Sequence, residues 1–253
     1  MYSSQISRPY PSLRTRNVAT SKYRQSDARP SSVRDLDSRF LRALTESDLK
    51  SLLATGTTWT FPGPAVVVRQ GEPADRLFLL LKGTGKYFIH TQEGRKLLLI
   101  WLAPGEIFGG SALLDQPGDY LCSVEVIGGT QILVWERNRI RDFAARCPKL
   151  LENALGVASE YLVWYVASHA ALTCHTARQR LAHLLHELAE GIGRRVPGGV
   201  TLALTNEELA NASNLTLFTT SRLMAEWQRR GALTKSRGRV LLRHPERLIA
   251  AGQ

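Results

Sequence analysis

The side chains with the clearest capacity for chemistry stand near the end of the 253-residue chain. Arg222 carries a planar guanidinium that can donate two parallel hydrogen bonds to the edge of a guanine base. Three basic residues alternate along a segment just beyond it, and such charges bind the phosphates of nucleic acid. Two large apolar side chains, Leu217 and Phe218, precede Arg222. The candidate DNA-binding residues are Thr216, Leu217, Phe218, Ser221, Arg222, Lys235, Arg237 and Arg239.

Two short helices joined by a polar turn are expected to position these residues. Thr205-Asn-Glu-Glu208 is a capping box that opens the first helix, and Thr216 is suited to cap the second. The second helix spaces four residues for burial on one side, namely Thr220, Leu223, Met224 and Trp227. A two-stranded ribbon with a basic tip follows at 233–242. Because a helix fits the major groove and a basic ribbon reaches phosphates, residues 176–253 predict a winged helix–turn–helix domain that binds DNA.

Charge is concentrated at the two ends of the chain. The formal net charge is +11, from 33 Lys and Arg against 22 Asp and Glu. Residues 1–34 hold seven basic side chains against one acid, 35–175 hold fourteen against fifteen, and 176–253 hold twelve against six. A neutral body with a basic end is typical of a sensor joined to a nucleic-acid reader, although a generally basic surface would give the same total. Residues 1–34, rich in Ser, Arg and Pro, are expected to form a disordered basic tail.

Residues 35–139 predict a β-rich domain with a short helical segment before it. Apolar and β-branched runs, such as VVV at 66–68 and LFLLL at 77–81, alternate with glycines about eleven to twelve residues apart. Short strands at that spacing indicate a sandwich or barrel, here a β-roll of the jelly-roll type. Together with the helices predicted in residues 176–253, this β-rich domain gives a predicted fold class of α+β.

The pattern becomes helical over 140–175, where two apolar stripes run side by side. One stripe follows steps of four and three, which is typical of a helix that pairs with a second helix. We expect a homodimer seam that consists of Leu151, Leu155, Ala158, Leu162, Tyr165, His169 and Leu172. The neighbouring stripe, which includes Tyr161 and Trp164, is expected to pack on the β-domain. A helix buried inside one domain would show the same period. Thr176-Ala-Arg-Gln179 is a capping box that starts the next helix.

Several other classes of protein are disfavoured. The cysteines Cys122, Cys147 and Cys174 lie too far apart in sequence for a four-cysteine iron–sulfur cluster or a zinc ribbon, and no metal site is expected. No apolar run approaches the ~18–20 residues that span a bilayer, and no signal-peptide pattern is seen, so we expect a cytoplasmic protein without a membrane partner. No nucleophile elbow or phosphate-binding loop is present, so we do not expect an enzyme.

Separate segments of the chain resemble the Crp–Fnr family of bacterial transcription regulators. They are RQGEPADRLFLLLKGTGKYF (69–88), WLAPGEIFGGSALLD (101–115), the long helix, TARQRLAHLLHEL (176–188) and the helix–turn–helix. The resemblance covers residues 45–248 and implies a cyclic-nucleotide-binding-like β-roll, a dimerising helix and a winged helix. It also implies a homodimer that binds palindromic double-stranded DNA and contacts RNA polymerase.

The effector pocket departs from the members of that family that bind cyclic AMP. Their Glu position is Gly110 here, their phosphate-binding Arg position is about Tyr120, and their hydroxyl survives at best as Ser123. Burial of a phosphate without a cation is very unfavourable, so cyclic AMP is not expected, although the N–H groups of Gly109 and Gly110 could cradle an anion. Three alternatives stay open: the pocket holds an apolar or aromatic ligand, it holds a different nucleotide, or it holds no ligand and the β-roll is only a scaffold. The candidate pocket consists of Gly109, Gly110, Ser111, Leu113, Tyr120, Cys122, Ser123, Tyr161 and Trp164.

The cofactor-binding branches of the family fit less well. The iron–sulfur branch needs an N-terminal cysteine cluster, which this sequence lacks. Haem ligation would fall to His90 or His169, and a lone histidine on an apolar face is more typical of a core residue.

The start of the second helix departs from the family as well. The best-known members read base edges there with an Arg and a Glu followed by another Arg, and those positions are Leu217, Phe218 and Arg222 here. Only Arg222 retains the bidentate capacity for guanine. Leu217 and Phe218 offer apolar contact, for which the thymine methyl is the natural target. We therefore expect an altered half-site, unless the two apolar residues are buried and the helix is rotated.

Overall fold

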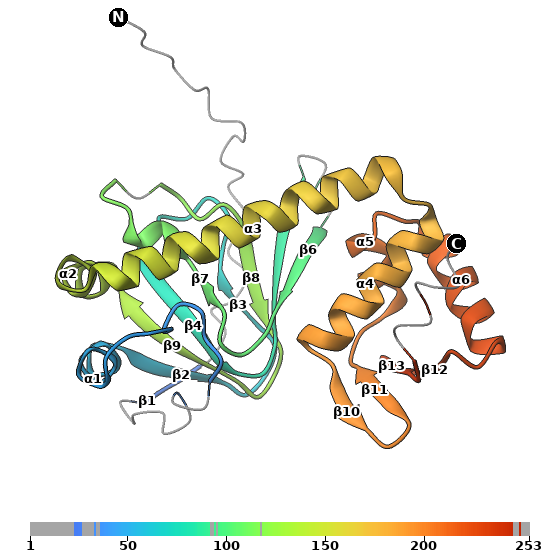
Figure 1. Ribbon diagram of the computed structural model, residues 1–253, viewed down its shortest axis with the longest axis horizontal. Coiled ribbons are helices and arrows are strands. Elements are labelled where there is room, and N and C mark those ends of the chain that lie inside the picture. Colours follow the sequence, from blue (N-terminus) through green and yellow to red (C-terminus); the bar gives the residue numbers. More distant parts are fainter. Residues whose placement is uncertain are drawn as a thin grey trace, which may run out of the picture.

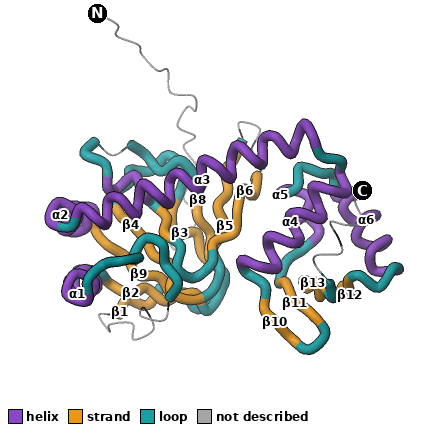
Figure 2. Tube along the Cα trace, viewed as in Figure 1, coloured by secondary structure: helices purple, strands orange, loops and turns teal. Residues whose placement is uncertain are grey.

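The computed structural model describes residues 23–26, 33, 36–91, 94, 96–116, 118–244 and 248. The chain forms two domains connected by one long helix, α3 (Pro148–Cys174), which runs along the β-rich domain and ends at the smaller C-terminal domain (Figure 1). Figure 2 shows the strands of the larger domain gathered beneath α3, and helices packed with a small sheet in the other domain. The predicted α+β fold, with β-roll, long helix and winged helix, is confirmed.

Two antiparallel sheets form the β-roll. One has the strand order β1-β2-β9-β4-β7, and the other has the order β3-β8-β5-β6. Side chains from both sheets, among them Phe78, Leu80 and Val124, form a fully buried core between them because apolar area is removed from water there. The strands are β1 (Arg24–Ser26), β2 (Thr57–Phe61), β3 (Ala65–Val68), β4 (Arg76–Lys82), β5 (Gly85–His90), β6 (Lys96–Leu102), β7 (Ile107–Phe108), β8 (Ser123–Val126) and β9 (Thr130–Glu136).

The regularly spaced glycines lie at turns where the backbone takes a left-handed conformation. Gly105 has φ of +97°, and a Cβ added there would collide with the carbonyl of Asp37. Gly83 has φ of +96°, and an added Cβ would meet the side chain and backbone of Thr130. Both restrictions exclude other residues at these turns. The glycine spacing read from the sequence therefore marks the ends of strands.

The helical run predicted over 140–175 is two helices rather than one. Helix α2 (Arg137–Arg146) begins directly after β9, and α3 starts at Pro148 after a break at Cys147. Proline is favoured at the first helical position but disfavours a helical conformation at the residue before it. Cys147 accordingly has φ −127° and ψ 79°. The 27 residues of α3 span about 40 Å.

The C-terminal domain begins at α4 (Ala177–Gly191), and both predicted capping boxes are present. The hydroxyl of Thr176 accepts from the N–H of Gln179, and Thr205 does the same with Glu208. Pro197 and Gly198 connect β10 and β11 in a hairpin, in which Val196 lies opposite Gly199. The remaining elements are β10 (Arg194–Val196), β11 (Gly199–Leu202), α5 (Asn206–Ala212), α6 (Leu217–Arg229), β12 (Leu233–Ser236) and β13 (Arg239–Leu242), with the sheet order β10-β11-β13-β12.

The N-terminal segment has more structure than the sequence indicated. Strand β1 pairs with β2, with Gln25 opposite Trp59. The ring of Tyr23 stacks on that of Trp59 with 4.1 Å between centroids. The short helical segment that was predicted before the β-rich domain is the helix α1 (Glu46–Ala54). The prediction of disorder therefore does not hold for residues 23–26, and the rest of the 1–34 segment, apart from the buried Val33, lies outside the described residues.

Candidate nucleic-acid interface and effector cavity

Helix α6 buries one face and exposes the other. Its cap is the predicted one, because the hydroxyl of Thr216 accepts from the N–H of Thr219 at 3.1 Å. The buried face consists of the four predicted residues, Thr220, Leu223, Met224 and Trp227. Leu223 and Trp227 belong to the core that α6 shares with α4, α5 and the small sheet. The side of the helix that is left in solvent is therefore set by the packing of its opposite face.

The exposed face begins with the two apolar residues. Leu217 is 52% exposed and Phe218 is 79% exposed, so the alternative in which they are buried and the helix is rotated is wrong. Arg222 lies one turn further along and is also exposed. The hydroxyl of Ser221 is less free, because it accepts a hydrogen bond from the side chain of Asn206 at 2.9 Å. The first two turns of α6 thus present an apolar tip followed by one guanidinium.

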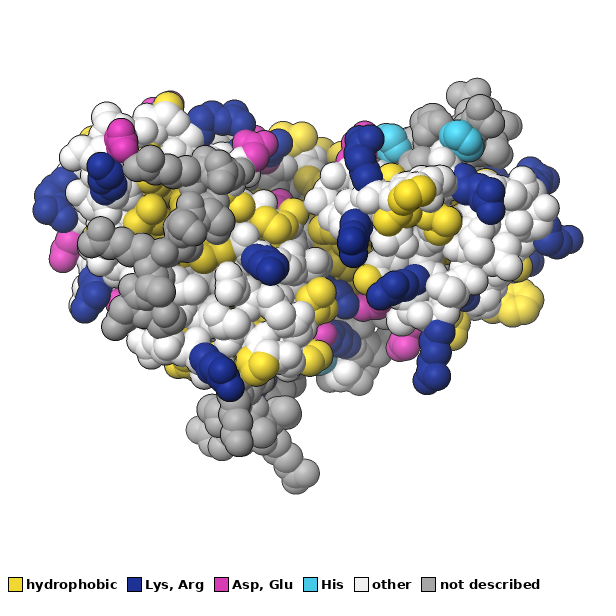
Figure 3. Space-filling view, turned by 90° about the horizontal axis from the view of Figure 1, so that it is seen from below, with side chains coloured by type: hydrophobic (Ala, Val, Ile, Leu, Met, Phe, Trp, Pro, Cys, Tyr) yellow, Lys and Arg dark blue, Asp and Glu magenta, His cyan; other side chains and the backbone are white. Residues whose placement is uncertain are grey.

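Strands β12 and β13 form the predicted wing. Gly238 has φ of +68° at its turn, and the three basic side chains of Lys235, Arg237 and Arg239 are exposed. The backbone N–H of Lys235 donates to the side chain of Gln228, which fastens the wing to the end of α6. Within the described part of the chain, no carboxylate pairs with the three wing cations or with Arg222. Figure 3 shows a face of the C-terminal domain on which Lys and Arg greatly outnumber acidic residues.

Two arginines of α4 position the helix–turn–helix, and the sequence patterns did not identify either. The guanidinium of Arg180 donates to the carbonyl of His175 at 2.9 Å and to that of Ser213 at 3.1 Å. It therefore connects the end of α3 to the turn between α5 and α6. Arg178 forms an ion pair with Glu226 of α6 at 2.6 Å. The contacts of Arg180 with Ser213 and of Arg178 with Glu226 join residues more than thirty positions apart, which local spacing cannot reveal.

The two apolar stripes of α3 face in different directions. All seven predicted seam residues are exposed, and Leu155, Leu162 and Tyr165 are 63–68% exposed. The neighbouring stripe is partly buried against the β-roll, as Tyr161 and Trp164 illustrate. The alternative of a helix buried on both faces within one chain is therefore wrong. The exposed stripe leaves a continuous apolar surface along the helix.

A cavity of about 700 Å³ lies between α3 and the open side of the β-roll. Eight of the nine predicted pocket residues line it: Gly109, Gly110, Ser111, Leu113, Tyr120, Cys122, Tyr161 and Trp164. Ser123 does not. Its side chain is buried in β8, and its hydroxyl accepts from the backbone N–H of Gln70 at 3.0 Å. Val124, the next residue of β8, lines the cavity instead, because successive side chains of a strand point to opposite sides.

Tyr120 is built into the wall of the cavity. Its hydroxyl accepts from the N–H of Arg76 at 3.0 Å and lies 3.2 Å from a carboxylate oxygen of Asp75. Burial raises the pKa of Tyr120, so the phenol stays neutral at physiological pH. Gly110 leaves open space at the position of the family's glutamate, since nothing lies within 4 Å of a Cβ placed on it. Neither position supplies a charge to the cavity.

The other polar groups of the cavity are also neutral. Burial raises the pKa of the Cys122 thiol to about 11 and raises that of Tyr161 as well. The hydroxyl of Tyr161 is buried and has no hydrogen-bond partner among the described residues. Its ring meets that of Tyr87 edge-on, with 6.2 Å between centroids. Among the described residues that line the cavity, none carries a charge.

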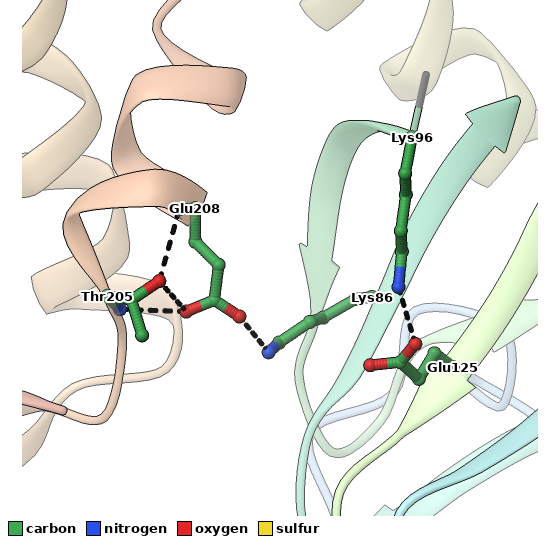
Figure 4. A network of polar contacts seen from close by, with 5 residues as sticks. All are labelled: Lys86, Lys96, Glu125, Thr205 and Glu208. Atoms are coloured by element: carbon green, nitrogen blue, oxygen red, sulfur yellow. Dashed lines mark hydrogen bonds and ion pairs between the residues drawn. The ribbon is translucent and has the colours of Figure 1, made fainter. Parts of the chain in front are cut away.

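The two domains meet along β6 and α5. Leu98 and Trp101 of β6 are buried within the core of the C-terminal domain. Beside them, Lys86 of β5 forms an ion pair with Glu208 of α5, as Figure 4 shows. The β-roll and the helix–turn–helix are thus connected both by α3 and by a direct side contact.

The candidate haem ligands occupy unremarkable surroundings. The ring of His90 packs edge-on against Phe88, and that of His169 stacks on Tyr165 at the exposed seam. In the described ranges, no three His, Cys, Asp or Glu side chains lie close enough together to hold a metal ion. Nor does a helix of those ranges have the length and apolar character needed to cross a membrane.

A sensor-type β-roll, a long helix with an exposed apolar stripe and a winged helix–turn–helix define a DNA-binding regulator. Residues 59–147 match the model of the cyclic nucleotide-binding domain, and residues 179–251 match that of the Crp-like helix-turn-helix domain. The CRP-like cAMP-activated global transcriptional regulator of Mycobacterium tuberculosis is 30% identical over 190 residues, which cover 74% of this chain and 84% of that protein. The chain belongs to the Crp–Fnr family of transcription regulators.

Solved structures agree with this fold. FixK2 from Bradyrhizobium japonicum has a TM-score of 0.67 and 20% identity, over 78% of this chain and 98% of that chain. CLP, a c-di-GMP responsive global regulator from Xanthomonas campestris, has a TM-score of 0.68 and 19% identity, over 78% and 99% of the two chains. At these identities the likeness concerns the fold alone.

Proposed function

We propose that the chain acts as a homodimer that binds a palindromic DNA operator through α6 and the wing. The exposed apolar tip of α6 beside Arg222 carries this proposal, because a buried tip could not reach base edges. The basic wing on the same domain supports it, since phosphate contacts orient a reading helix in the major groove.

Dimerisation through α3 is proposed from the exposed stripe of seven seam residues. Apolar area in water costs roughly 25 cal/mol per Å², so a stripe that follows the length of a long helix favours pairing with a second copy. Steps of four and three are the spacing at which two helices interlock. A two-fold symmetric dimer would present two reading helices to two half-sites.

The operator is proposed to differ from that of the family members that read with Arg and Glu. Leu217 and Phe218 would contact thymine methyl groups, and Arg222 would contact one guanine in each half-site. By family resemblance, the DNA-bound dimer would contact RNA polymerase in the cytoplasm.

The β-roll is proposed to respond to something other than cyclic AMP. The Mycobacterium tuberculosis relative is described as cAMP-activated. In this chain the positions that hold the nucleotide in the family are Gly110 and Tyr120, and the phenol of Tyr120 is engaged with Arg76 and Asp75. A cyclic phosphate would meet no cation in the described lining.

Site selection from a randomised pool of duplexes, followed by native mass spectrometry of the recovered complex, tests the proposed function. We expect an inverted repeat with guanine and thymine in each half-site, half-sites about one helical turn apart, and two chains per duplex. Enrichment of no sequence, or one chain per duplex, would contradict it.

A further inference from the structure

The cavity between α3 and the β-roll has the size and place of a ligand site. Its volume of about 700 Å³ falls within the range of roughly 300–1,000 Å³ typical of small-molecule sites, which often lie at the mouths of β-barrels and rolls. Both elements contribute to it, since Ile100, Phe108 and Val124 belong to the β-roll whereas Val157 and Trp164 belong to α3. A ligand held there would contact the sensor domain and the long helix together.

The lining decides the chemistry of what could fill this space. Every residue of the described lining is uncharged, and most are aliphatic or aromatic. A phosphate or carboxylate would lose its hydration and gain no opposite charge, which is strongly unfavourable. An apolar molecule would lose unfavourable contact with water and gain close packing against the aliphatic and aromatic wall.

One polar group in the cavity wall, the hydroxyl of Tyr161, can orient an otherwise apolar ligand. The hydroxyl of Tyr161 is buried without a partner, and a buried donor left unpaired costs about 1–3 kcal/mol. The hydroxyl of Tyr120, by contrast, already accepts from the N–H of Arg76. A carbonyl, ether or hydroxyl oxygen on a ligand would satisfy the Tyr161 hydroxyl.

We propose that this cavity binds an uncharged, mainly apolar small molecule with one hydrogen-bond acceptor, which the hydroxyl of Tyr161 holds. The proposal deepens the proposed function, because it names the class of effector of the β-roll. It does not depend on DNA binding, and it can be tested without DNA. The seam residues Leu155 and Leu162 also line the mouth of the cavity, so a second copy of the chain would cover the bound molecule.

The neutral fluorophore N-phenyl-1-naphthylamine, titrated into the full-length protein, is a direct probe of the cavity. We expect saturable binding at one site per chain. Gly110→Leu should weaken it roughly tenfold or more, because the added side chain enters open space at the cavity wall and takes up ligand volume. Gly63→Leu is the matched control, since Gly63 also has open space around it and lies outside the cavity lining, and it should bind the probe as the unaltered chain does.

Two displacing molecules of similar shape test the role of Tyr161. 2-Acetylnaphthalene carries a carbonyl acceptor, and in 2-isopropylnaphthalene a methyl group takes the place of the carbonyl oxygen. Tyr161→Phe should weaken displacement by the first about fivefold and leave the second unchanged, because it removes one hydrogen bond and no volume. This variant keeps the ring packed, so it remains informative if Gly110→Leu does not fold.

Three outcomes would overturn the proposal. The first is probe binding that does not saturate or that is equal in Gly110→Leu and the unaltered chain. The second is an equal response of Tyr161→Phe to both displacing molecules. The third is displacement of the probe by micromolar cyclic AMP, which would return the cavity to an anionic ligand. None of these three outcomes would change the result of the operator-selection experiment. The ligand proposal and the proposed function can therefore be contradicted separately.

Discussion

Glu208 of α5 joins Lys86 of β5 across the boundary between the two domains, and the same carboxylate caps its own helix. The carboxylate accepts from the backbone N–H of Thr205 at 2.8 Å. Lys86 lies opposite Glu125 in the register of β5 and β8, but Glu125 pairs with Lys96 at 2.5 Å instead (Figure 4). Lys86 is thereby left to reach the C-terminal domain. One carboxylate thus caps the first helix of the helix–turn–helix and attaches it to the β-roll.

Breaking this ion pair should loosen the attachment of the C-terminal domain. Glu208→Gln keeps an acceptor for Thr205 but removes the charge, and Lys86→Met keeps most of the apolar stem. The side chains are only 13% and 25% exposed, so we expect a coupling free energy of about 1 kcal/mol, more than an open surface pair provides. A double-mutant cycle on the free energy of unfolding measures it. A coupling near zero would show that the pair adds nothing to the attachment.

The same pair should make the attachment sensitive to acid. Burial alone would raise the pKa of Glu208, but hydrogen bonds from Lys86 and Thr205 more than offset it, so the pKa is lowered. A carboxyl group of this kind stabilises the folded state above its unfolded pKa of about 4.3, and the contribution is lost as pH falls through the lower folded value. The difference in unfolding free energy between the unaltered chain and Glu208→Gln should therefore be constant near pH 7 and shrink below about pH 4. A difference that grew towards acid would reverse this assignment.

Arg222 should supply base specificity rather than general affinity. Arg222→Ala is expected to cost about 1–3 kcal/mol on the selected operator and to relax the preference at one base pair of each half-site, because a bidentate contact to guanine is lost. Quantitative binding to the operator and to single-base variants measures this. Arg229→Ala removes the same charge from the last turn of α6 and should leave the base preference intact. An equal loss on every sequence for Arg222→Ala would make it a phosphate contact.

The wing should act through charge alone. We expect a change to Ala at Lys235, Arg237 or Arg239 to weaken binding to any duplex. Each change should also reduce the slope of log affinity against log salt by about one, because one fewer counterion is released. Arg194→Ala is a suitable control, since β10 is at the opposite edge of the same small sheet from the wing strand β12. An unchanged slope would remove the wing from the interface.

A charge placed on the seam should separate the proposed dimer. Leu162→Glu introduces a carboxylate in the middle of the exposed apolar stripe, where pairing would bury it at a cost of several kcal/mol. We expect a monomer in sedimentation that no longer selects an inverted repeat. Ala167→Glu, which is exposed on the opposite side of α3, should remain a dimer. A Leu162→Glu dimer of unaltered stability would place the interface on another face.

Local chemistry in the sequence was enough for several elements of this protein. The capping residues Thr176, Thr205 and Thr216 marked helix starts correctly, because each cap needs only a hydroxyl and an N–H a few positions on. The stripes of α3 predicted which face would be exposed, since 3.6 residues per turn sorts side chains without reference to any partner. Runs of apolar and β-branched residues indicated strands such as β3 and β4, because such side chains favour a pleated, half-buried surface. Short strands such as β1, β7 and β10 were not indicated.

What local patterns could not supply is which distant groups meet. The pairing of Lys86 with Glu208 rather than with Glu125, its neighbour in the sheet register, depends on how the two domains pack. Arg180 likewise bridges His175 and Ser213 only because α4 returns across the helix–turn–helix. The chain alone therefore determined most of its elements, its family traits and the exposed faces of its helices, since those follow from periodicity and short-range hydrogen bonds. The tertiary structure decided the uncharged cavity and the contact between domains, because burial and charge pairing depend on neighbours that the order of residues does not name.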